Sequence, residues 1–380
     1  MYPRITRLFL ILDLVSTSAC RAGSFPSSQS TTTSLLHQPA FVRSCPAPFT
    51  TSSSTSVICR VSSLPPPVPF PALLTAYSDS RDRVVSVEAK TGGYADENGG
   101  TTGGKGKKKT TVSSTRAFLK AIRQKGSLAI RVKGNKIKLS GMEKVESDKT
   151  IIGVGNNKAT VRGGGLEIKG VSNVIVQNIL FADIKGKKKD AISIDNSKNV
   201  WIDHCDFTKT NDGMVDVKRG SDYVTVSWNH FIGPHQKTCL LGHDDDNGKQ
   251  DKKHLTVTYH HNWFDGTKER HPRVRFSKLC HVYNNYYSEN QGYGVASTMK
   301  ANVLVEHNYF EGVDRPTLVG YGTSGSGKLD GSAIGTNVFV NCGRPETKGN
   351  VDIGPPYNYN ADRAREVRNV VRDGAGRGLN

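Results

Sequence analysis

The sequence predicts an all-β fold, a right-handed single-stranded parallel β-helix in which successive coils stack into a solenoid. Short phrases such as NVWIDHCDF and NVLVEHNYF recur along the chain, and the aromatic residues that end them are 23 to 33 residues apart. These aromatic residues are Phe181, Phe207, Phe231, Phe264, Tyr287, Phe310 and Phe339. A repeat of this length is typical of a solenoid, because each coil buries its apolar face only by stacking on its neighbours.

A second recurring residue and the pattern around it favour the same fold. Asn stands two residues before the aromatic in five phrases, at Asn229, Asn262, Asn285, Asn308 and Asn337. Stacked at one corner of successive coils, each Asn amide can donate to and accept from the next, so that a buried polar turn is satisfied without water. The runs alternate apolar and polar residues and are rich in Val, Ile, Thr and Tyr, which indicates strands.

The chain is expected to consist of a tail and one elongated domain. Of the 60 residues from 16 to 75, 31 are Ser, Thr or Pro, and such a composition buries too little apolar surface to offset its ordering entropy. We therefore expect residues 21–83 to be a disordered stalk or pro-region. Residues 1–20, in which two arginines precede the run LFLILDLV, resemble a signal peptide, so a secreted, extracellular protein is expected. Residues 84–380 are expected to form the β-helix.

The charge of the chain points to an anionic partner. Residues 84–380 hold 45 Lys or Arg against 31 Asp or Glu, which is +14 of the net charge of +18. A solenoid this basic favours a polyanion through long-range attraction, and both nucleic acid and acidic polysaccharide qualify. No nucleic-acid-binding module is recognisable, and no segment reaches the ~18 consecutive apolar residues of a membrane span. We therefore expect a monomer that binds neither nucleic acid nor a membrane.

Two features of the composition each have two interpretations. The seven Cys lack zinc-site spacing, and the sequence leaves open whether they are small buried residues or form one or two disulfides. The lysine runs at 104–109 and 186–189 are either solvated loops, the interpretation we favour, or contacts to phosphate.

Three acids stand close to the strand phrases. Asp212 and Asp216 are separated by an even number of residues, so an extended segment keeps both on one face. Asp190 lies about one coil earlier and should therefore be adjacent in space. Converging carboxylates repel one another unless a hard cation such as Ca²⁺ lies among them. Taken singly, each Asp is equally compatible with a turn cap.

Downstream of the acids the charges reverse. Lys237 in PHQKTCLLG, and Arg270 and Arg275 in GTKERHPRVRF, should fall on the next two coils on the same face. Acids on one side and fixed cations on the other would suit a substrate whose carboxylate is bridged to a metal ion and held by cations. The alternative is a set of surface salt bridges, which are common and individually weak.

Residues 84–380 resemble polysaccharide lyase family 1, the pectate lyases. The motifs that carry the resemblance are WIDHCDF at 201–207, DGMVDVKRGSDYVTVSWNHF at 212–231, VTYHHNWF at 257–264, ERHPRVRF at 269–276 and HVYNNYY at 281–287. The resemblance implies Ca²⁺ ligands at Asp190, Asp212 and Asp216, a catalytic base at Arg270, and binding of the substrate carboxylate by Lys237 and Arg275.

Three positions depart from the family pattern or vary within it. Lys188 stands where many relatives have a second acid, which puts an accessory Ca²⁺ contact in question, and Ser277 stands where relatives often have Gly. His243 and the acids at 244–246 lie where relatives vary, and we interpret them as a solvated turn.

The resemblance also implies a substrate and a reaction. Polygalacturonate carries a carboxylate at C6 of each sugar, so neutralising it with Ca²⁺ and cations makes the C5 proton more acidic. Once a base removes that proton, β-elimination expels the 4-O glycosidic bond and leaves a C4=C5 double bond. Arginine acts as a base only after losing its own proton, so an alkaline optimum is expected.

Three other functions are weighed against this one. A pectin lyase acting on methyl-esterified chains would dispense with Ca²⁺, so the three acids argue against it. A glycoside hydrolase needs an acid and a carboxylate across the sugar ring, whereas the residues opposite the acids are Lys and Arg. A non-catalytic, polyuronate-binding solenoid would use Arg270 and Lys237 for affinity alone, and an assay for unsaturated products separates it from the enzyme.

Overall fold

The computed structural model describes residues 90–379 except 107, 157–158 and 187–188. The chain divides into two units, Met1–Asp79 and Ser80–Asn380, and every described residue belongs to the second. The expected signal peptide and stalk therefore lie outside the described residues, as does Lys188.

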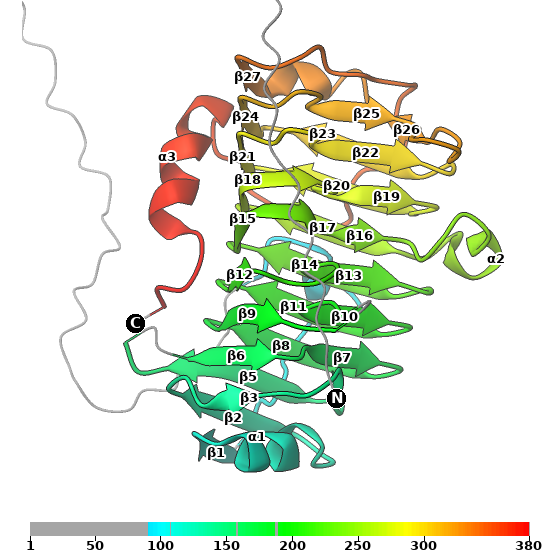
Figure 1. Cartoon of the computed structure of the whole chain (residues 1–380). Coiled ribbons are helices and arrows are strands. Elements are labelled where there is room, and N and C mark those ends of the chain that lie inside the picture. The colour runs from blue at the N-terminus through cyan, green and yellow to red at the C-terminus, as the bar shows by residue number, and fades with distance from the viewer. Residues whose placement is uncertain (1–89, 107, 157–158, 187–188, 380) are drawn as a thin grey trace, which may run out of the picture. The chain divides into compact units, whose positions relative to one another are not determined.

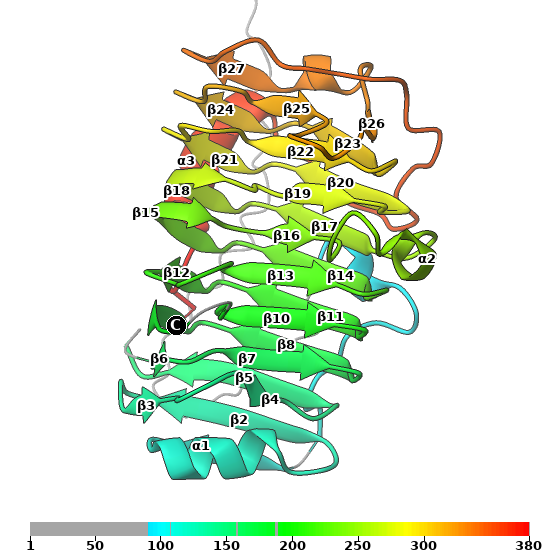
Figure 2. The ribbon, with the colours of Figure 1, turned by 45° about the vertical axis from the view of Figure 1, so that its right-hand side comes forward.

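Three parallel sheets form a β-solenoid of about 9 turns, which confirms the predicted parallel β-helix (Figures 1 and 2). Sheet A contains β1 (Lys109–Val112), β2 (Leu128–Lys133), β5 (Lys149–Val154), β8 (Ser172–Gln177), β11 (Lys198–Asp203), β14 (Asp222–Ser227), β17 (Thr256–His260), β20 (Leu279–Tyr283), β23 (Asn302–Glu306) and β26 (Lys328–Leu329). Sheet B contains β3 (Ile137–Lys138), β6 (Thr160–Gly163), β9 (Leu180–Ile184), β12 (Asp206–Thr208), β15 (His230–Lys237), β18 (Trp263–Glu269), β21 (Tyr286–Ser288), β24 (Tyr309–Glu311) and β27 (Val338–Val340). Sheet C contains β4 (Glu143–Lys144), β7 (Leu166–Lys169), β10 (Ile192–Asp195), β13 (Val215–Lys218), β16 (Leu240–Leu241), β19 (Arg273–Arg275), β22 (Val295–Thr298) and β25 (Thr317–Val319).

The aromatic repeat forms a continuous stack inside sheet B. Each ring of the seven lies on the next with centroids 4.2 to 5.4 Å apart, from Phe181 to Phe339. The strand register places Phe207 opposite Phe181 and Phe231 opposite Phe264. Consecutive coils therefore bury equivalent residues against one another, which is the source of the sequence period.

The Asn column forms the predicted hydrogen-bonded ladder. The Nδ2 of Asn229 donates to Oδ1 of Asn262 at 3.0 Å, and that of Asn262 to Asn285 at 2.9 Å. Asn285 continues to Asn308 and Asn308 to Asn337 in the same way. Each amide is thereby satisfied at a buried corner where water has no access.

The solenoid begins earlier than the aromatic repeat indicates. Its first coils run from β1 and β2, where the interior is filled by aliphatic residues such as Ile130 and Val132. In the sheet register Val161 takes the position opposite Phe181. An aliphatic residue fills the same interior position as the aromatic, so the coil persists where the repeat is not visible in the sequence.

Helices cover one end and one side of the solenoid. The helix α1 (Thr115–Ile122) caps the N-terminal end, with Phe118 and Ile122 fully buried and Ser114 accepting from the Ala117 amide as N-cap. The C-terminal α3 (Ala364–Gly374) lies beside sheet B (Figure 1) and packs Val367 and Val371 against Tyr286. The remaining short helices are η1 (Tyr94–Asp96), α2 (Gly248–Asp251) and η2 (Ile334–Thr336).

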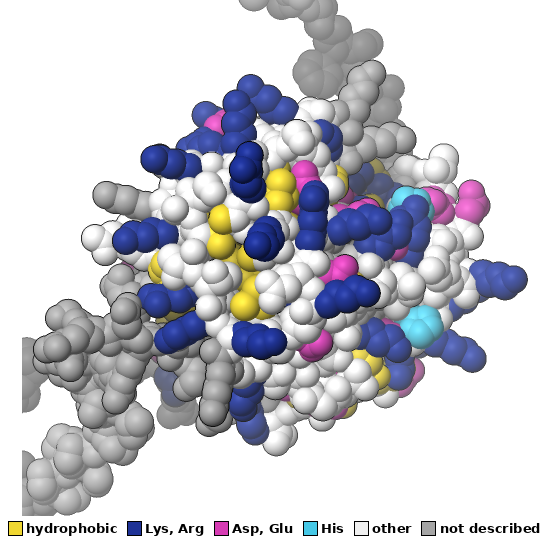
Figure 3. All heavy atoms as spheres, turned by 90° about the horizontal axis from the view of Figure 1, so that it is seen from below, with side chains coloured by type: hydrophobic (Ala, Val, Ile, Leu, Met, Phe, Trp, Pro, Cys, Tyr) yellow, Lys and Arg dark blue, Asp and Glu magenta, His cyan; other side chains and the backbone are white. Residues whose placement is uncertain are grey.

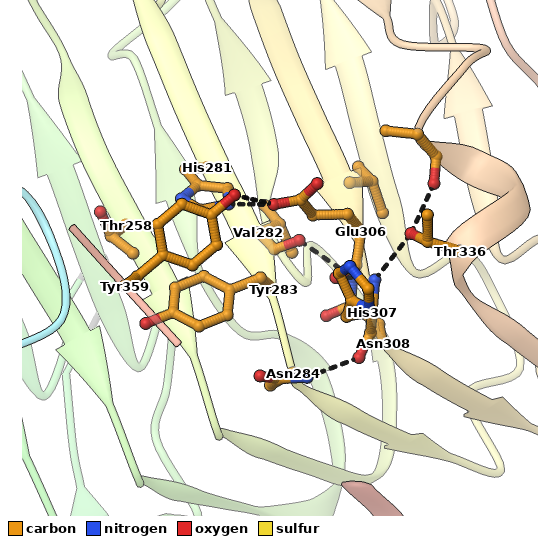
Figure 4. Close-up of polar contacts among 12 residues, drawn as sticks. Thr258, His281, Val282, Tyr283, Asn284, Glu306, His307, Asn308, Thr336 and Tyr359 are labelled. Atoms are coloured by element: carbon orange, nitrogen blue, oxygen red, sulfur yellow. Dashed lines mark hydrogen bonds and ion pairs between the residues drawn. The ribbon is translucent and has the colours of Figure 1, made fainter. Parts of the chain in front are cut away.

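The C-terminal segment that precedes α3 is held on sheet A by a buried polar cluster (Figure 4). His281 is fully buried, with Nε2 3.0 Å from Oε1 of Glu306 and Nδ1 2.8 Å from the Tyr357 hydroxyl. The hydroxyl of Tyr359 donates to the same Glu306 carboxylate. These contacts fasten a segment distant in sequence to strands β20 and β23.

The structure answers one question that the sequence left open. The four Cys of the described region are all free thiols, and Cys205, Cys239 and Cys280 are completely buried. They are small core residues, whereas Cys20, Cys45 and Cys59 lie outside the described residues. None of the helices that the structure describes is long and apolar enough to cross a membrane.

Candidate active site

Sheet C brings Asp190 and Asp216 together, one coil apart as expected. Asp190 lies two residues before β10, and Ser193 of β10 is in register with Asp216 of β13. Oδ1 of Asp190 accepts from the Gly213 amide at 3.0 Å, and Oδ1 of Asp216 accepts from the Leu240 amide at 3.1 Å. A Cβ at Gly213 would lie only 2.3 Å from Oδ1 of Asp216, so glycine is needed for this close approach.

Lys218, which sequence reasoning missed, lies between these two acids. Its Nζ is 3.0 Å from Oδ2 of Asp190 and 3.5 Å from Oδ2 of Asp216, and its side chain is only 13% exposed. The available signal was its spacing, because Lys218 is two residues after Asp216 on the same strand and so shares its face.

The electrostatics of this cluster favour a bound cation. Burial, and after it repulsion from Asp190, raises the pKa of Asp216 to about 7. Burial acts to lower the pKa of Lys218, but the attraction of the two carboxylates outweighs it and raises that pKa. The acid pair is therefore short of positive charge even with Lys218 in place.

The third acid, Asp212, points to a different partner. Its Oδ1 lies 3.1 Å from Nζ of Lys237, the last residue of β15. Its backbone carbonyl accepts hydrogen bonds from Thr210 Oγ1 and His235 Nε2 at 3.1 and 2.7 Å. Among the described residues no group of three or more His, Cys, Asp or Glu side chains is arranged to hold a metal ion. The structure thus places two of the three predicted ligands together and the third beside them, paired with Lys237.

Arg270 is half-buried at the corner between β18 and β19. Its backbone has a φ of 69°, the left-handed region that is uncommon for a non-glycine residue. Its Nε is buried without a hydrogen-bond partner, and within the described part of the chain the side chain forms no ion pair. Its charge nevertheless acts on Asp216, where it offsets part of the rise in pKa that burial and Asp190 cause. Arg270 is thus a cation near the acids that has no carboxylate bound to it.

Arg275, the last residue of β19, is paired with Asp245. Its Nε lies 2.6 Å from Oδ1 of Asp245, whose Oδ2 accepts from the Ser324 hydroxyl at 2.6 Å. Partial burial acts to raise the pKa of Asp245, but the hydrogen bonds from Ser324 and Arg275 lower it overall. Asp245 lies in a turn, as expected for residues 244–246, but its carboxylate is paired with Arg275 and Ser324 and is not simply solvated.

Arg273 is a further cation of this face that the sequence analysis did not single out. It lies two residues before Arg275 on β19, and its Nη2 donates to Ser324 Oγ at 2.6 Å. Its guanidinium lies over the ring of Tyr321, 4.8 Å from the centroid, and the Tyr321 hydroxyl donates to Glu269 at 3.0 Å. The alternation in the phrase RVR was the signal, since both arginines face the same side of the strand.

Comparisons with known proteins identify the family. Residues 80–350 match the family model described as pectate lyase. A pectate trisaccharide-lyase of Bacillus licheniformis is 33% identical over 75% of this chain and 86% of its own length, and pectate lyase A of Aspergillus niger is 38% identical over 76% and 87%. The crystal structure of a pectate lyase from Bacillus sp. N165 in complex with trigalacturonate superposes with a TM-score of 0.65 at 30% identity, over 75% of this chain and 98% of that one. The chain belongs to the pectate lyase family and is a polysaccharide lyase.

Proposed function

We propose that the protein is a secreted, Ca²⁺-dependent pectate lyase that cleaves de-esterified polygalacturonate by β-elimination to give 4,5-unsaturated oligogalacturonides. The observation that carries this proposal is the arrangement on sheet C, where a buried acid pair lies near Arg270, a cation with no ion-pair partner among the described residues. The trigalacturonate bound by the related Bacillus enzyme supports the substrate class.

The residues present fit a calcium ion. Asp190 and Asp216 offer carboxylate oxygens, the ligands that Ca²⁺ prefers, and their shared cation Lys218 shows that this position attracts positive charge. Asp212 would complete the set if its carboxylate turned from Lys237 toward the pair. When bound, Ca²⁺ would neutralise the C6 carboxylate of the substrate and so make the C5 proton more acidic.

The protein side chains would supply the rest of the chemistry. Lys237 and Arg275 would bind the substrate carboxylate, and their partners Asp212 and Asp245 hold both cations in position beforehand. Arg270, in its unprotonated form, would take the C5 proton. The electron pair of the C5–H bond becomes the C4=C5 double bond, and the C4–O4 bond breaks with its electrons on the leaving oxygen. Because Arg270 must first lose a proton, activity should rise with pH.

The acid pair also separates this proposal from the pectin lyase alternative. A methyl-esterified carboxyl carries no charge to bridge to a cation, so a pectin lyase would have no use for two buried carboxylates side by side. Burial, and after it repulsion from Asp190, raises the pKa of Asp216, and a bound cation would offset both effects.

An assay of the purified full chain tests the proposal. Polygalacturonate and methyl-esterified pectin are incubated with the protein in Ca²⁺ or in chelator, and the ultraviolet absorbance of the conjugated product is followed. We expect product from polygalacturonate in Ca²⁺ alone. Equal activity in excess chelator, or preference for the methyl ester, would overturn the proposal in favour of the pectin lyase.

A further inference from the structure

The positive charge of the chain is concentrated at the N-terminal end of the solenoid. Residues 105–146 hold 13 Lys or Arg against 2 Asp or Glu, which is +11 of the net +18, whereas residues 147–380 contribute only +5. The exposed members are Lys105, Lys108, Lys109, Arg116, Lys120, Arg123, Lys125, Lys133, Lys136, Lys138 and Lys144. We call these residues the N-terminal basic surface. Viewed along the solenoid axis from that end, Lys and Arg side chains are distributed across the described face and outnumber the acidic ones among them (Figure 3).

The capping helix presents part of this charge. Arg116 and Lys120 are four residues apart on α1 and therefore neighbours on its surface. The opposite face of α1 buries Phe118 and Ile122 against the first coil. Packing of the apolar face thus forces the two cations toward the solvent at the end of the molecule.

Backbone hydrogen bonds join the other lysines to this helix and to the first strands. Thr115 Oγ1 donates to the carbonyl of Lys136 or Lys138 and accepts from the Lys138 amide at 2.9 Å. On the other side, the carbonyl of Lys108 accepts from the Ala129 amide of β2 at 3.1 Å. The fold therefore collects lysines from three segments at one end.

Acidic residues do little to neutralise the surface. Of the two acids in residues 105–146, Glu143 is buried and pairs with Arg123. The side chains of Arg116, Lys120 and Lys136 form no ion pair within the described structure. Most of the charge is therefore available to an anionic partner.

We propose that the N-terminal basic surface is a second polyuronate-binding surface, separate from the candidate active site, that retains the enzyme on long or insoluble pectate chains. The partner class rests on the proposed function, because a polyuronate repeats one carboxylate on every sugar. The coil of Asp216 is three to four coils from β2, or about 14 to 19 Å at the usual strand spacing. A polymer can contact both surfaces at once, whereas a short oligosaccharide bound at sheet C leaves this end free.

Two other anionic partners fit the surface less well. Single-stranded nucleic acids stack their bases on exposed aromatic side chains, and the only aromatic residue in residues 105–146 is the buried Phe118. Membrane-surface binding uses an exposed apolar face beside the basic one. The exposed large hydrophobic residues of the described structure are Ile353 and Leu379, neither of which belongs to this surface.

A charge-reversal variant of the full chain tests the proposal. We would combine Arg116→Glu, Lys120→Glu and Lys136→Glu, three exposed side chains whose replacement leaves the core intact. The matched control places the same charge change at Lys252, Arg344 and Arg365, which are also exposed and form no ion pair with any residue that the structure describes. Retardation in native gels that contain polygalacturonate and chelator, so that no cleavage is expected, gives the dissociation constants.

We expect the triple variant to bind polygalacturonate roughly tenfold more weakly at low salt than either the wild type or the control. Its kcat/KM on trigalacturonate should stay unchanged, while its rate on insoluble pectate falls. If the triple variant bound polygalacturonate as tightly as the control does, the proposal would be overturned. It would also be overturned if the wild type bound RNA or phosphatidylserine vesicles more tightly than polygalacturonate and the triple variant lost that binding. A wild type that binds polygalacturonate through this surface but never cleaves it would refute the proposed function alone.

Discussion

The ammonium of Lys218 lies 3.0 Å from Oδ2 of Asp190, so one of the acids proposed to bind Ca²⁺ already has a cation of the protein itself beside it. When no metal is bound, Lys218 stabilises the two carboxylates, and it competes with a metal ion for the position between them. Both effects can be measured.

Lys218→Met should destabilise the metal-free protein and strengthen Ca²⁺ binding. Removing one partner of a buried ion pair costs roughly 3 kcal/mol, because the carboxylates are left without a counter-charge. Calorimetry should therefore show tighter Ca²⁺ binding, and Ca²⁺ should raise the Tm of the variant more than that of the wild type. An unchanged Ca²⁺ affinity would contradict the idea that Lys218 and the ion share one position.

Asp216→Asn should lower Ca²⁺ affinity and activity together while the coils stay folded. The amide keeps the shape of the side chain but loses the negative charge that holds a hard cation. Asp183→Asn, at a partly exposed position on sheet B where the carboxylate pairs with Arg162, is the control and should leave both quantities unchanged. Calcium titration of each variant, with circular dichroism to verify folding, provides the measurement.

Arg270→Lys tests the proposed base. Lysine keeps a positive charge at this corner but loses the planar guanidinium and its placement, so kcat should fall by roughly 100-fold or more with little change in KM. Arg275→Lys is the comparison, and its loss should appear mainly in KM because Arg275 is proposed to bind the carboxylate. A near-normal kcat in Arg270→Lys would move the role of base to Lys237.

Stability should fall as the pH drops below about 6.5, through the buried histidines of sheet A. Burial lowers the pKa of His281 and of His260. Below the ordinary histidine pKa of ~6.5 these residues are therefore protonated in the unfolded chain but stay neutral in the folded protein. The free energy of unfolding then decreases by up to ~1.4 kcal/mol per pH unit for each histidine until its folded pKa is reached. The raised pKa of Asp216 has the opposite effect. As the pH falls, the folded protein takes up this proton before the unfolded chain does, which increases the free energy of unfolding.

Comparison with His281→Gln isolates the histidine contribution. Urea unfolding of wild type and variant at pH 7.5 and pH 5.5 gives four free energies, and the pH dependence should be smaller in the variant. The same slope in both proteins would show that His281 titrates alike in the folded and unfolded states.

The tail should be dispensable for catalysis. Its Ser, Thr and Pro composition offers neither coil nor catalytic group, and the family match begins at residue 80. A chain that begins near Arg81 should keep the specific activity of the full protein. A large loss in a correctly folded truncation would contradict the proposed division at residue 83.

The fold itself was predictable from the sequence, because in a solenoid the contacts that build the core repeat along the chain. Phe207 stacks on Phe181 and Asn262 bonds to Asn285 for the same reason that these residues recur at intervals of one coil. That regularity also predicted that Asp190 and Asp216 would be neighbours, since one coil of separation places them on adjacent strands. The aromatic signature does not extend to the first coils, because Val161 fills the interior position opposite Phe181.

Only the tertiary structure decided how the charges of the site pair. Asp245 binds Arg275 at the end of β19 and Ser324, which are 30 and 79 residues away, and no period in the sequence relates these three residues. The pairing of Lys218 with the acid pair, and of Lys237 at the end of β15 with Asp212, likewise depends on how far each lysine side chain reaches. Strand periodicity determines which face a residue occupies, whereas the partner of a long charged side chain is set by distances of a few ångström between coils.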